Sequence, residues 1–342
     1  MFLILSTMTA LLECGSIFLG IGLGYSPGRA FSLCLAYQAG NLFPIPFRLR
    51  IDALRKVTLL SALLLCVAPF LNIFSSLQWG LYFTGILLLS CAAQSVRAEM
   101  KTRIGTVRKR FARIAGFLLA PLPAYIPFPL LLLCCLIVFF SLGRLTDCAK
   151  ATDIPAPKLH SVCTIMLWHQ LHYFIYAYGV LLYAYRITGN PFLTMLFFAC
   201  TWLTYLSAEP LAKLLQHTFP KSFGTFSGAS FYTKMILAGH AVLLLILLLL
   251  PNVPYGLFLF LWILTGFGGG TVFAITGLYR HSSSYMKEQL VLTENLGHFM
   301  GTGFAVVWTL VFPKCLLQLS YPAAICVLMV LVTTFTAKER HL

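Results

Sequence analysis

The stretch LWHQLHYFIYAYGVLLYAY, residues 167–185, combines the apolar content of a membrane span with two histidines near its middle. At helical spacing His169, His172, Tyr176 and Tyr183 fall on one face, because residues three, four and seven apart share one side of a helix. Ionisable groups inside a span are costly, so they usually face a protein interior or a water-filled cavity. The stretch therefore predicts a membrane helix with a polar, inward-facing side.

Composition places the whole chain in the same class. Of its 342 residues 59% are hydrophobic and 10% are charged, and the mean hydropathy is +0.88. Soluble domains carry about 25% charged residues. A bilayer admits only helices or a closed barrel, and the unbroken apolar runs at 130–140 and 241–250 lack the alternation of a barrel strand. We expect an all-α integral membrane protein.

Twelve apolar segments have roughly the 20 residues needed to cross a bilayer. They are residues 2–22, 29–47, 55–74, 78–97, 110–125, 128–143, 161–186, 190–212, 229–250, 254–278, 290–312 and 318–337. The first does not read as a signal peptide, because it has no basic leader and contains Glu13. The most polar stretch separates the sixth segment from the seventh. We therefore predict a six-helix bundle at 1–143, a cytoplasmic linker at 144–160 and a second six-helix bundle at 161–342.

The basic residues set the orientation and argue against nucleic acid as a partner, although the net charge is +15. With the N-terminus inside, the outer loops hold only Arg29, Arg186 and Lys314 of the 24 lysines and arginines. This asymmetry predicts cytoplasmic N- and C-termini in the cell (inner) membrane. The densest basic run, 97–113, is interpreted as a topology signal that contacts anionic lipid headgroups.

Cysteines and histidines give weak evidence for a metal site. The 11 cysteines lie mostly inside the predicted spans and show no paired CxxC spacing, so a disulfide framework or a zinc site is not expected. His169 and His172 alone would form only half of a metal site, and His240 is interpreted as a lone packed histidine.

The two halves of the chain echo each other. YSPGRAF at 25–31 and YRITGNPF at 185–192 both form short outer turns, and IAGFLLA at 114–120 corresponds in position to NLGHFMG at 295–301. Two six-helix halves in the same orientation, joined by a cytoplasmic linker, imply parallel repeats about an axis along the membrane normal.

With this organisation the chain resembles the major facilitator superfamily over essentially its whole length. FRLRIDALRK at 47–56 is similar to the family's acidic-basic loop motif, with Asp52, Arg55 and Lys56 as the matching residues. GFLLAPLPA at 116–124 is similar to the small-residue and proline motif of antiporters. The resemblance implies alternating access between two bundles, with helices one and seven lining a central cavity, and no enzymatic activity. It leaves the subfamily open.

Glu13 and His172 are predicted to lie at the same depth. Each lies about 11 residues into its span, which corresponds to about 16 Å at 1.5 Å per residue. A buried carboxyl and an imidazole are suited to exchange protons with substrate near neutral pH, so Glu13, His172 and His169 are the candidate proton-coupling residues. The alternative is that these groups are neutral and satisfied by neighbouring helices.

Other polar residues are candidates for substrate binding or for gates, with helix packing as the alternative. The candidate substrate-binding residues are Gln38, Asn41, Gln94, Tyr176 and Trp168. The candidate gate or structural polar residues are Asp52, Arg55, Glu209, Glu294, Asn295 and His298. Glu209 is expected to pair with a loop lysine or arginine. The glycines between 266 and 270 lack a preceding strand and a following lysine, which favours close helix packing or a hinge over a phosphate loop.

These features favour a secondary transporter, which we expect to export a small organic solute such as a drug-like compound or a siderophore, driven by a proton gradient and needing no cofactor. Uptake is the main alternative. A haem or metal enzyme using His169, His172, His240 and His298 is a further one, as is a non-transporting receptor or assembly subunit. We expect a monomer.

Overall fold

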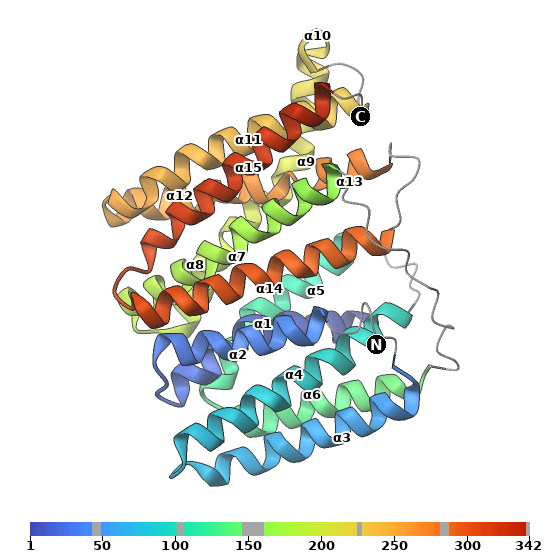
Figure 1. Ribbon diagram of the computed structural model, residues 1–342, viewed down its shortest axis with the longest axis vertical. Coiled ribbons are helices and arrows are strands. Elements are labelled where there is room, and N and C mark those ends of the chain that lie inside the picture. Colours follow the sequence, from blue (N-terminus) through green and yellow to red (C-terminus); the bar gives the residue numbers. More distant parts are fainter. Residues whose placement is uncertain (43–48, 101–105, 146–160, 224–227, 281–286, 340–342) are drawn as a thin grey trace. The chain divides into compact units, whose positions relative to one another are not determined.

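The computed structural model describes residues 1–42, 49–100, 106–145, 161–223, 228–280 and 287–339, and these residues form helices and no strand (Figure 1). The first helices are α1 (Phe2–Gly22), α2 (Pro27–Leu42), α3 (Ile51–Val67), η1 (Ala68–Leu71), α4 (Ser75–Glu99), α5 (Thr106–Leu119), η2 (Leu122–Ala124) and α6 (Pro127–Leu142). The later ones are α7 (Ser161–Thr188), α8 (Pro191–Ala199), α9 (Thr201–Thr218), α10 (Pro220–Phe223), α11 (Ala229–Leu249), η3 (Leu250–Asn252), α12 (Tyr255–Gly270), α13 (Val272–Arg280), α14 (Lys287–Val311), η4 (Leu317–Leu319) and α15 (Ser320–Glu339). The all-helical class is confirmed.

Each of the twelve predicted segments coincides with helix over its described part. Three of them are divided, and the first, 110–125, breaks between α5 and η2 at residues 120–121. The segment 190–212 breaks between α8 and α9 at Cys200, and 254–278 breaks between α12 and α13 at Thr271. Most of the predicted linker, at 146–160, lies outside the described residues.

Seven helical segments within the described ranges are long and apolar enough to span a membrane. They are Phe2–Gly22, Ile51–Leu71, Ser75–Glu99, Pro191–Thr218, Ala229–Asn252, Tyr255–Tyr279 and Leu317–Ala337. Helix α7 has 28 residues and α14 has 25, so both are long enough, but their polar residues lower their mean hydropathy. The twelve-span count therefore stays a prediction, and the multi-pass membrane class rests on the seven.

Exposed apolar side chains support this class. On α3, Leu59, Leu60 and Leu63 are 58%, 48% and 59% exposed, and α11 exposes Leu245 and Leu249 to a similar extent. Such surfaces would promote aggregation in water, whereas lipid tails solvate them. Buried positions instead include many polar side chains. This distribution is that of a helical membrane protein.

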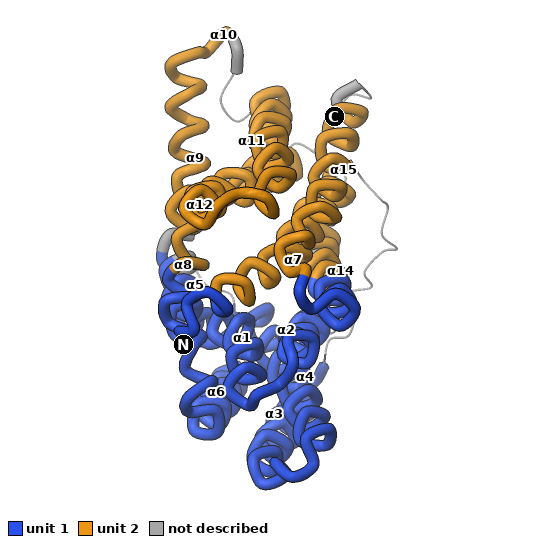
Figure 2. The backbone as a smooth tube through the Cα atoms, turned by 90° about the vertical axis from the view of Figure 1, so that its left-hand side faces the viewer, with its two compact units in different colours: residues 1–155, 185–196, 302–314 blue, residues 156–184, 197–301, 315–342 orange. Residues whose placement is uncertain are grey.

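The chain divides into two compact units (Figure 2). Unit 1 comprises residues 1–155, 185–196 and 302–314, and its apolar core is built from α1, α2, α3, α4 and α6. Unit 2 comprises 156–184, 197–301 and 315–342, and its core includes residues of α7, α11, α13 and α15. The division into bundles at 1–143 and 161–342 stays a prediction.

The two outer turns that the sequence paired are built alike. Gly24 follows α1 with φ +73, and Gly189 follows α7 with φ +60. A positive φ favours glycine, because a Cβ would clash with the backbone there. In both turns a proline, Pro27 or Pro191, opens the next helix, where its fixed φ suits the first position. The two turns thus share a sequence signal and a conformation; the wider internal repeat stays a prediction.

Small residues bring helices of unit 1 close together. A Cβ at Gly22 would lie 2.6 Å from the carbonyl oxygen of Ala124, and one at Gly116 would clash with the backbone of Thr7. The motif at 116–124 therefore packs α5 and η2 against α1. Its small residues permit this approach, as at other membrane helix interfaces.

Candidate functional site

Glu13 is the buried acid of unit 1. It is 7% exposed in the middle of α1, and its Oε2 lies 3.6 Å from Nη2 of Arg113 on α5. The Arg113 side chain is 42% exposed, so the ion pair connects a buried carboxylate with a half-exposed arginine side chain. Burying a carboxylate is tolerable only with a counter-charge or hydrogen bonds. The close packing of α1 on α5 places that counter-charge.

A second arginine reaches the same helix. Nη1 of Arg97, at the end of α4, donates to Oγ1 of Thr9 at 3.4 Å, one turn before Glu13. The sequence interpretation gave Arg97 and Arg113 only to topology and lipid headgroups, and their contacts with α1 were missed. One signal was present: a lone acid inside a span requires a cation, and the basic run at 97–113 enters the neighbouring span.

The candidate substrate residues of unit 1 lie on α2 and α4 and are buried. Oγ of Ser90 donates to Oδ1 of Asn41 at 3.0 Å and lies 2.7 Å from the carbonyl oxygen of Tyr37, joining the two helices. Gln38 and Gln94 are 1% and 7% exposed. Asn41 thus has a packing role, and substrate binding by these three residues stays a prediction.

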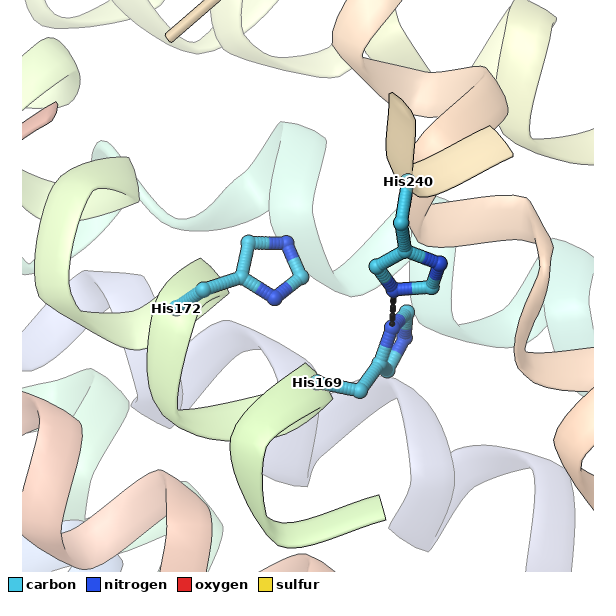
Figure 3. A group of neighbouring side chains, drawn as sticks. All are labelled: His169, His172 and His240. Atoms are coloured by element: carbon cyan, nitrogen blue, oxygen red, sulfur yellow. Dashed lines mark hydrogen bonds between the residues drawn. The ribbon is translucent and has the colours of Figure 1, made fainter. Parts of the chain in front are cut away.

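Unit 2 contains a cluster of three histidines, His169 and His172 from α7 and His240 from α11 (Figure 3). All three are buried, at 3%, 0% and 0% exposure. Each offers a ring nitrogen within 4.8 Å of those of the other two. The prediction that His240 is a lone packed histidine is wrong. Sequence separation hid the contact, because His169 and His240 are 71 positions apart in the chain.

The hydrogen bonds of the cluster determine its tautomers. Nδ1 of His240 lies 2.8 Å from the carbonyl oxygen of Ile236, which can only accept, so this nitrogen carries the proton. The Nε2 of a neutral His240 then has a free lone pair. Nδ1 of His169 lies 2.9 Å from that Nε2 and donates to it. Neither ring nitrogen of His172 bonds a described side chain, and the ring makes only weak contacts with the backbone carbonyl groups of Trp168 and His169.

Aromatic residues enclose this cluster. The ring of Tyr176 stacks on His172 with centroids 6.1 Å apart and an interplanar angle of 14°. Trp262 meets Tyr176 edge-on at 5.9 Å. Trp168, the other aromatic candidate for substrate binding, packs against the apolar core of unit 2. Of these two candidates, only Tyr176 contacts the histidine cluster.

The helix break at Thr271 lies beside the cluster. Oγ1 of Thr271 lies 2.6 Å from the carbonyl oxygen of Gly268 and 3.5 Å from Nδ1 of His240. The surrounding glycines permit close packing, since a Cβ at Gly266 would clash with Thr201 and one at Gly268 would lie 2.7 Å from Cδ2 of Leu243. Of the two interpretations of this glycine run, the structure supports close packing.

The candidate gate residues do not form one group. Asp52 and Arg55 pair at 3.3 Å on the exposed start of α3. Glu209 pairs with Lys213 one turn later on α9, at 3.0 Å, so its partner is basic as expected but lies in the same helix and not in a loop. These two pairs lie on separate helices of different units.

The α14 candidates differ from one another. Nε2 of His298 lies 3.1 Å from Oε1 of Gln170 on α7, and its ring packs on Phe174 with centroids 4.1 Å apart. Asn295 donates to the carbonyl oxygen of Val291 in its own helix. Glu294 is half-buried on the same helix. The contacts of His298 join α14 to α7, and a gating role for the three residues stays a prediction.

No protein-family model and no curated protein sequence matches the chain. Solved structures do match it over nearly its whole length. A bacterial homologue of the iron transporter ferroportin, in an outward-facing state with soaked iron, is 12% identical with a TM-score of 0.61, and the match covers 98% of each chain. A D-xylose–proton symporter is 12% identical with a TM-score of 0.59, covering 98% of this chain and 96% of that one. The chain has the major facilitator fold.

A third match extends this likeness. The fucose:proton symporter of E. coli is 10% identical with a TM-score of 0.54, and the match covers 98% of both chains. The structures named here are all transporters, not enzymes. Identities this low establish the fold, and the major facilitator resemblance drawn from the sequence is confirmed at that level.

Proposed function

We propose that this chain is a secondary transporter that works by alternating access and is driven by a proton gradient. The observation that carries the proposal is the major facilitator fold combined with a buried ionisable group in α1 and another in α7. Ionisable residues inside membrane helices are costly and typically mark proton or substrate pathways. Glu13 in α1 and His169 with His172 in α7 are the proposed proton-coupling residues.

The proposed cargo is a small organic solute, and the proposed direction is export by proton antiport. The antiporter-like motif at 116–124 supports this direction. In the structure that motif packs on the helix that carries Glu13. Movement of α5 would therefore alter the surroundings of the Glu13–Arg113 pair. Uptake is the rival direction, because two of the matched structures are titled as proton symporters.

The proposed setting is the cell (inner) membrane, with both termini in the cytoplasm, anionic headgroups against the basic run and the protein acting as a monomer. No cofactor is invoked, because the proton gradient supplies the energy.

Proteoliposomes containing the purified full chain and a trapped pH-sensitive dye test this function. An imposed pH gradient should drive accumulation or loss of a drug-like probe, here ethidium, and adding ethidium should move protons. Glu13→Gln should abolish proton movement, whereas His217→Ala, at an exposed site on α9, should leave it at the wild-type level. Proton movement that is identical in wild type and Glu13→Gln would refute the coupling role of Glu13. A panel of organic solutes that all fail to move protons would refute the proposed cargo class.

A further inference from the structure

The three-histidine cluster of unit 2 has the composition and the geometry of a metal site. We propose that His169, His172 and His240 bind a divalent transition-metal ion, with Zn²⁺ as the representative ion. Their three ring nitrogens lie within 4.8 Å of one another and come from two helices of the same unit. This goes beyond the proposed function, which requires only that the histidines exchange protons.

His240 is already in the form that a metal ligand needs. Its Nδ1–H is held by the Ile236 carbonyl at 2.8 Å, which leaves the Nε2 lone pair directed at His169. Metal-bound histidines almost always donate their second ring N–H to a carbonyl, carboxylate or water, because this fixes the tautomer and the ring orientation. The backbone of α11 supplies that partner here.

The distance between His169 and His240 suits a shared ion. Two imidazole nitrogens that each bind a metal at 2.0–2.1 Å lie about 2.9–3.4 Å apart. Nδ1 of His169 and Nε2 of His240 are 2.9 Å apart with only a proton between them. For the ion to replace that proton, His169 must carry its hydrogen on Nε2, the other neutral tautomer.

His172 supplies further evidence. Its ring is 0% exposed, no described side chain bonds either ring nitrogen, and only weak contacts with the backbone carbonyl groups of Trp168 and His169 in its own helix are available to it. A buried polar group left unsatisfied costs about 1–3 kcal/mol. The ring centroid of His172 lies 5.1 Å from that of His169 and 6.0 Å from that of His240. An ion bound by all three rings would give a His172 nitrogen a strong partner.

The ligand set selects the class of ion. Imidazole suits Zn, Cu, Fe and Ni, whereas Mg and Ca prefer oxygen ligands. Three protein ligands leave a fourth position open. The cluster contains no carboxylate, so the bound ion keeps its double positive charge and we expect an anion, such as hydroxide or chloride, in that position. The interrupted helix at Thr271 lies 3.5 Å from His240, and interrupted helices are where transporters of other folds bind ions.

Cobalt binding to the full-length protein tests the proposal. The untagged protein, purified in detergent and stripped with EDTA, is titrated with Co²⁺ and followed by visible absorption. We expect one equivalent of Co²⁺ to give the intense d–d bands of a tetrahedral site, and Zn²⁺ to bleach them. His172→Phe and His240→Phe should each weaken binding at least tenfold. His217→Ala on the surface of α9 and His298→Gln on α14 should keep one equivalent.

A fold check and a second measurement keep the test decisive. His172→Phe removes a poorly satisfied ring and can stack on Tyr176, so the variant should elute at the wild-type volume in size-exclusion chromatography. X-ray absorption at the zinc edge of the wild-type protein should show three imidazole nitrogens. Co²⁺ that retains its weak aqueous spectrum would overturn the proposal. So would stoichiometric binding that survives both phenylalanine substitutions, or a zinc edge without imidazole scattering. The proton-coupling role of Glu13 is tested separately, by Glu13→Gln in proteoliposomes, so its failure and the failure of the metal site are distinguishable.

Discussion

A double-mutant cycle on Glu13 and Arg113 measures how strongly the buried pair of unit 1 is coupled. The variants are Glu13→Gln, Arg113→Gln and the two combined. Glutamine keeps the shape of the glutamate side chain and removes its charge. The structure gives the separation of the charged atoms as 3.6 Å, with 9% of the Glu13 side chain and 42% of the Arg113 side chain exposed.

The expected coupling follows from these values. At 3.6 Å and an effective dielectric constant of about 20, Coulomb's law gives about 4–5 kcal/mol. Solvent around the half-exposed Arg113 screens this attraction, so we expect about 1–2 kcal/mol of coupling. The single variants should differ. Arg113→Gln should destabilise more than Glu13→Gln, because it removes the counter-charge of a buried carboxylate, whereas Glu13→Gln leaves a guanidinium that can turn to solvent.

Reversible unfolding in mixed detergent micelles, titrated with sodium dodecyl sulfate, gives the free energy of unfolding for each variant. The coupling is the double variant's loss minus the sum of the two single losses. Additive losses, or a larger loss for Glu13→Gln than for Arg113→Gln, would refute a functional ion pair at this position.

Three further changes test packing and burial. In EDTA, His172→Leu should raise the free energy of unfolding in micelles by about 1–3 kcal/mol, because it removes poorly satisfied buried nitrogens. A lower free energy of unfolding in this variant would show that the ring has stabilising partners. Gly270→Ala should lower the thermal midpoint, since its Cβ would lie 2.7 Å from the Tyr205 carbonyl oxygen and overpacking costs about 1–3 kcal/mol. Gly269→Ala is its control, because its Cβ has only an ordinary 3.5 Å contact and alanine favours the helix by up to about 1 kcal/mol; equal midpoints would contradict the packing argument. Gly116→Ala should likewise weaken the α1–α5 contact and lower the midpoint, measured against Gly80→Ala on α4, whose Cβ would meet nothing within 4 Å.

The helical segments were accessible from sequence, because a bilayer requires each span to be long, apolar and internally hydrogen-bonded. The breaks inside segments 190–212 and 254–278 were not accessible from sequence. At Cys200 the chain has no proline or glycine to signal a break, and at Thr271 the run of glycines allowed a hinge or tight packing equally. These breaks depend on contacts with neighbouring helices, which hydropathy does not contain.

The candidate sites were predicted residue by residue but not as clusters. Polar residues inside spans identified Glu13, His169 and His172, since such residues are expensive in a membrane. Their partners were given other roles, Arg113 as a topology signal and His240 as a lone packed histidine. Each lies on a helix whose neighbours depend on tertiary packing. The contact of Glu13 with Arg113 depends on the close approach of α5, and the contact of His169 with His240 depends on that of α11.

The Glu13–Arg113 pair and the histidine cluster are therefore unequal as proton sites. A proton added to Glu13 removes a buried charge. Solvent can then stabilise the charge of Arg113, whose side chain is 42% exposed. A proton added to the histidine cluster creates a charge among side chains that are 0–3% exposed, where desolvation is expensive. We therefore expect Glu13 to be the main proton-coupling residue, and His169 and His172 to contribute less, because their cluster holds a proton only when an anion accompanies the charge. On this argument Glu13→Gln should remove proton movement in proteoliposomes completely, whereas His172→Phe should reduce it less; a complete loss in His172→Phe with a normal Glu13→Gln would reverse the assignment.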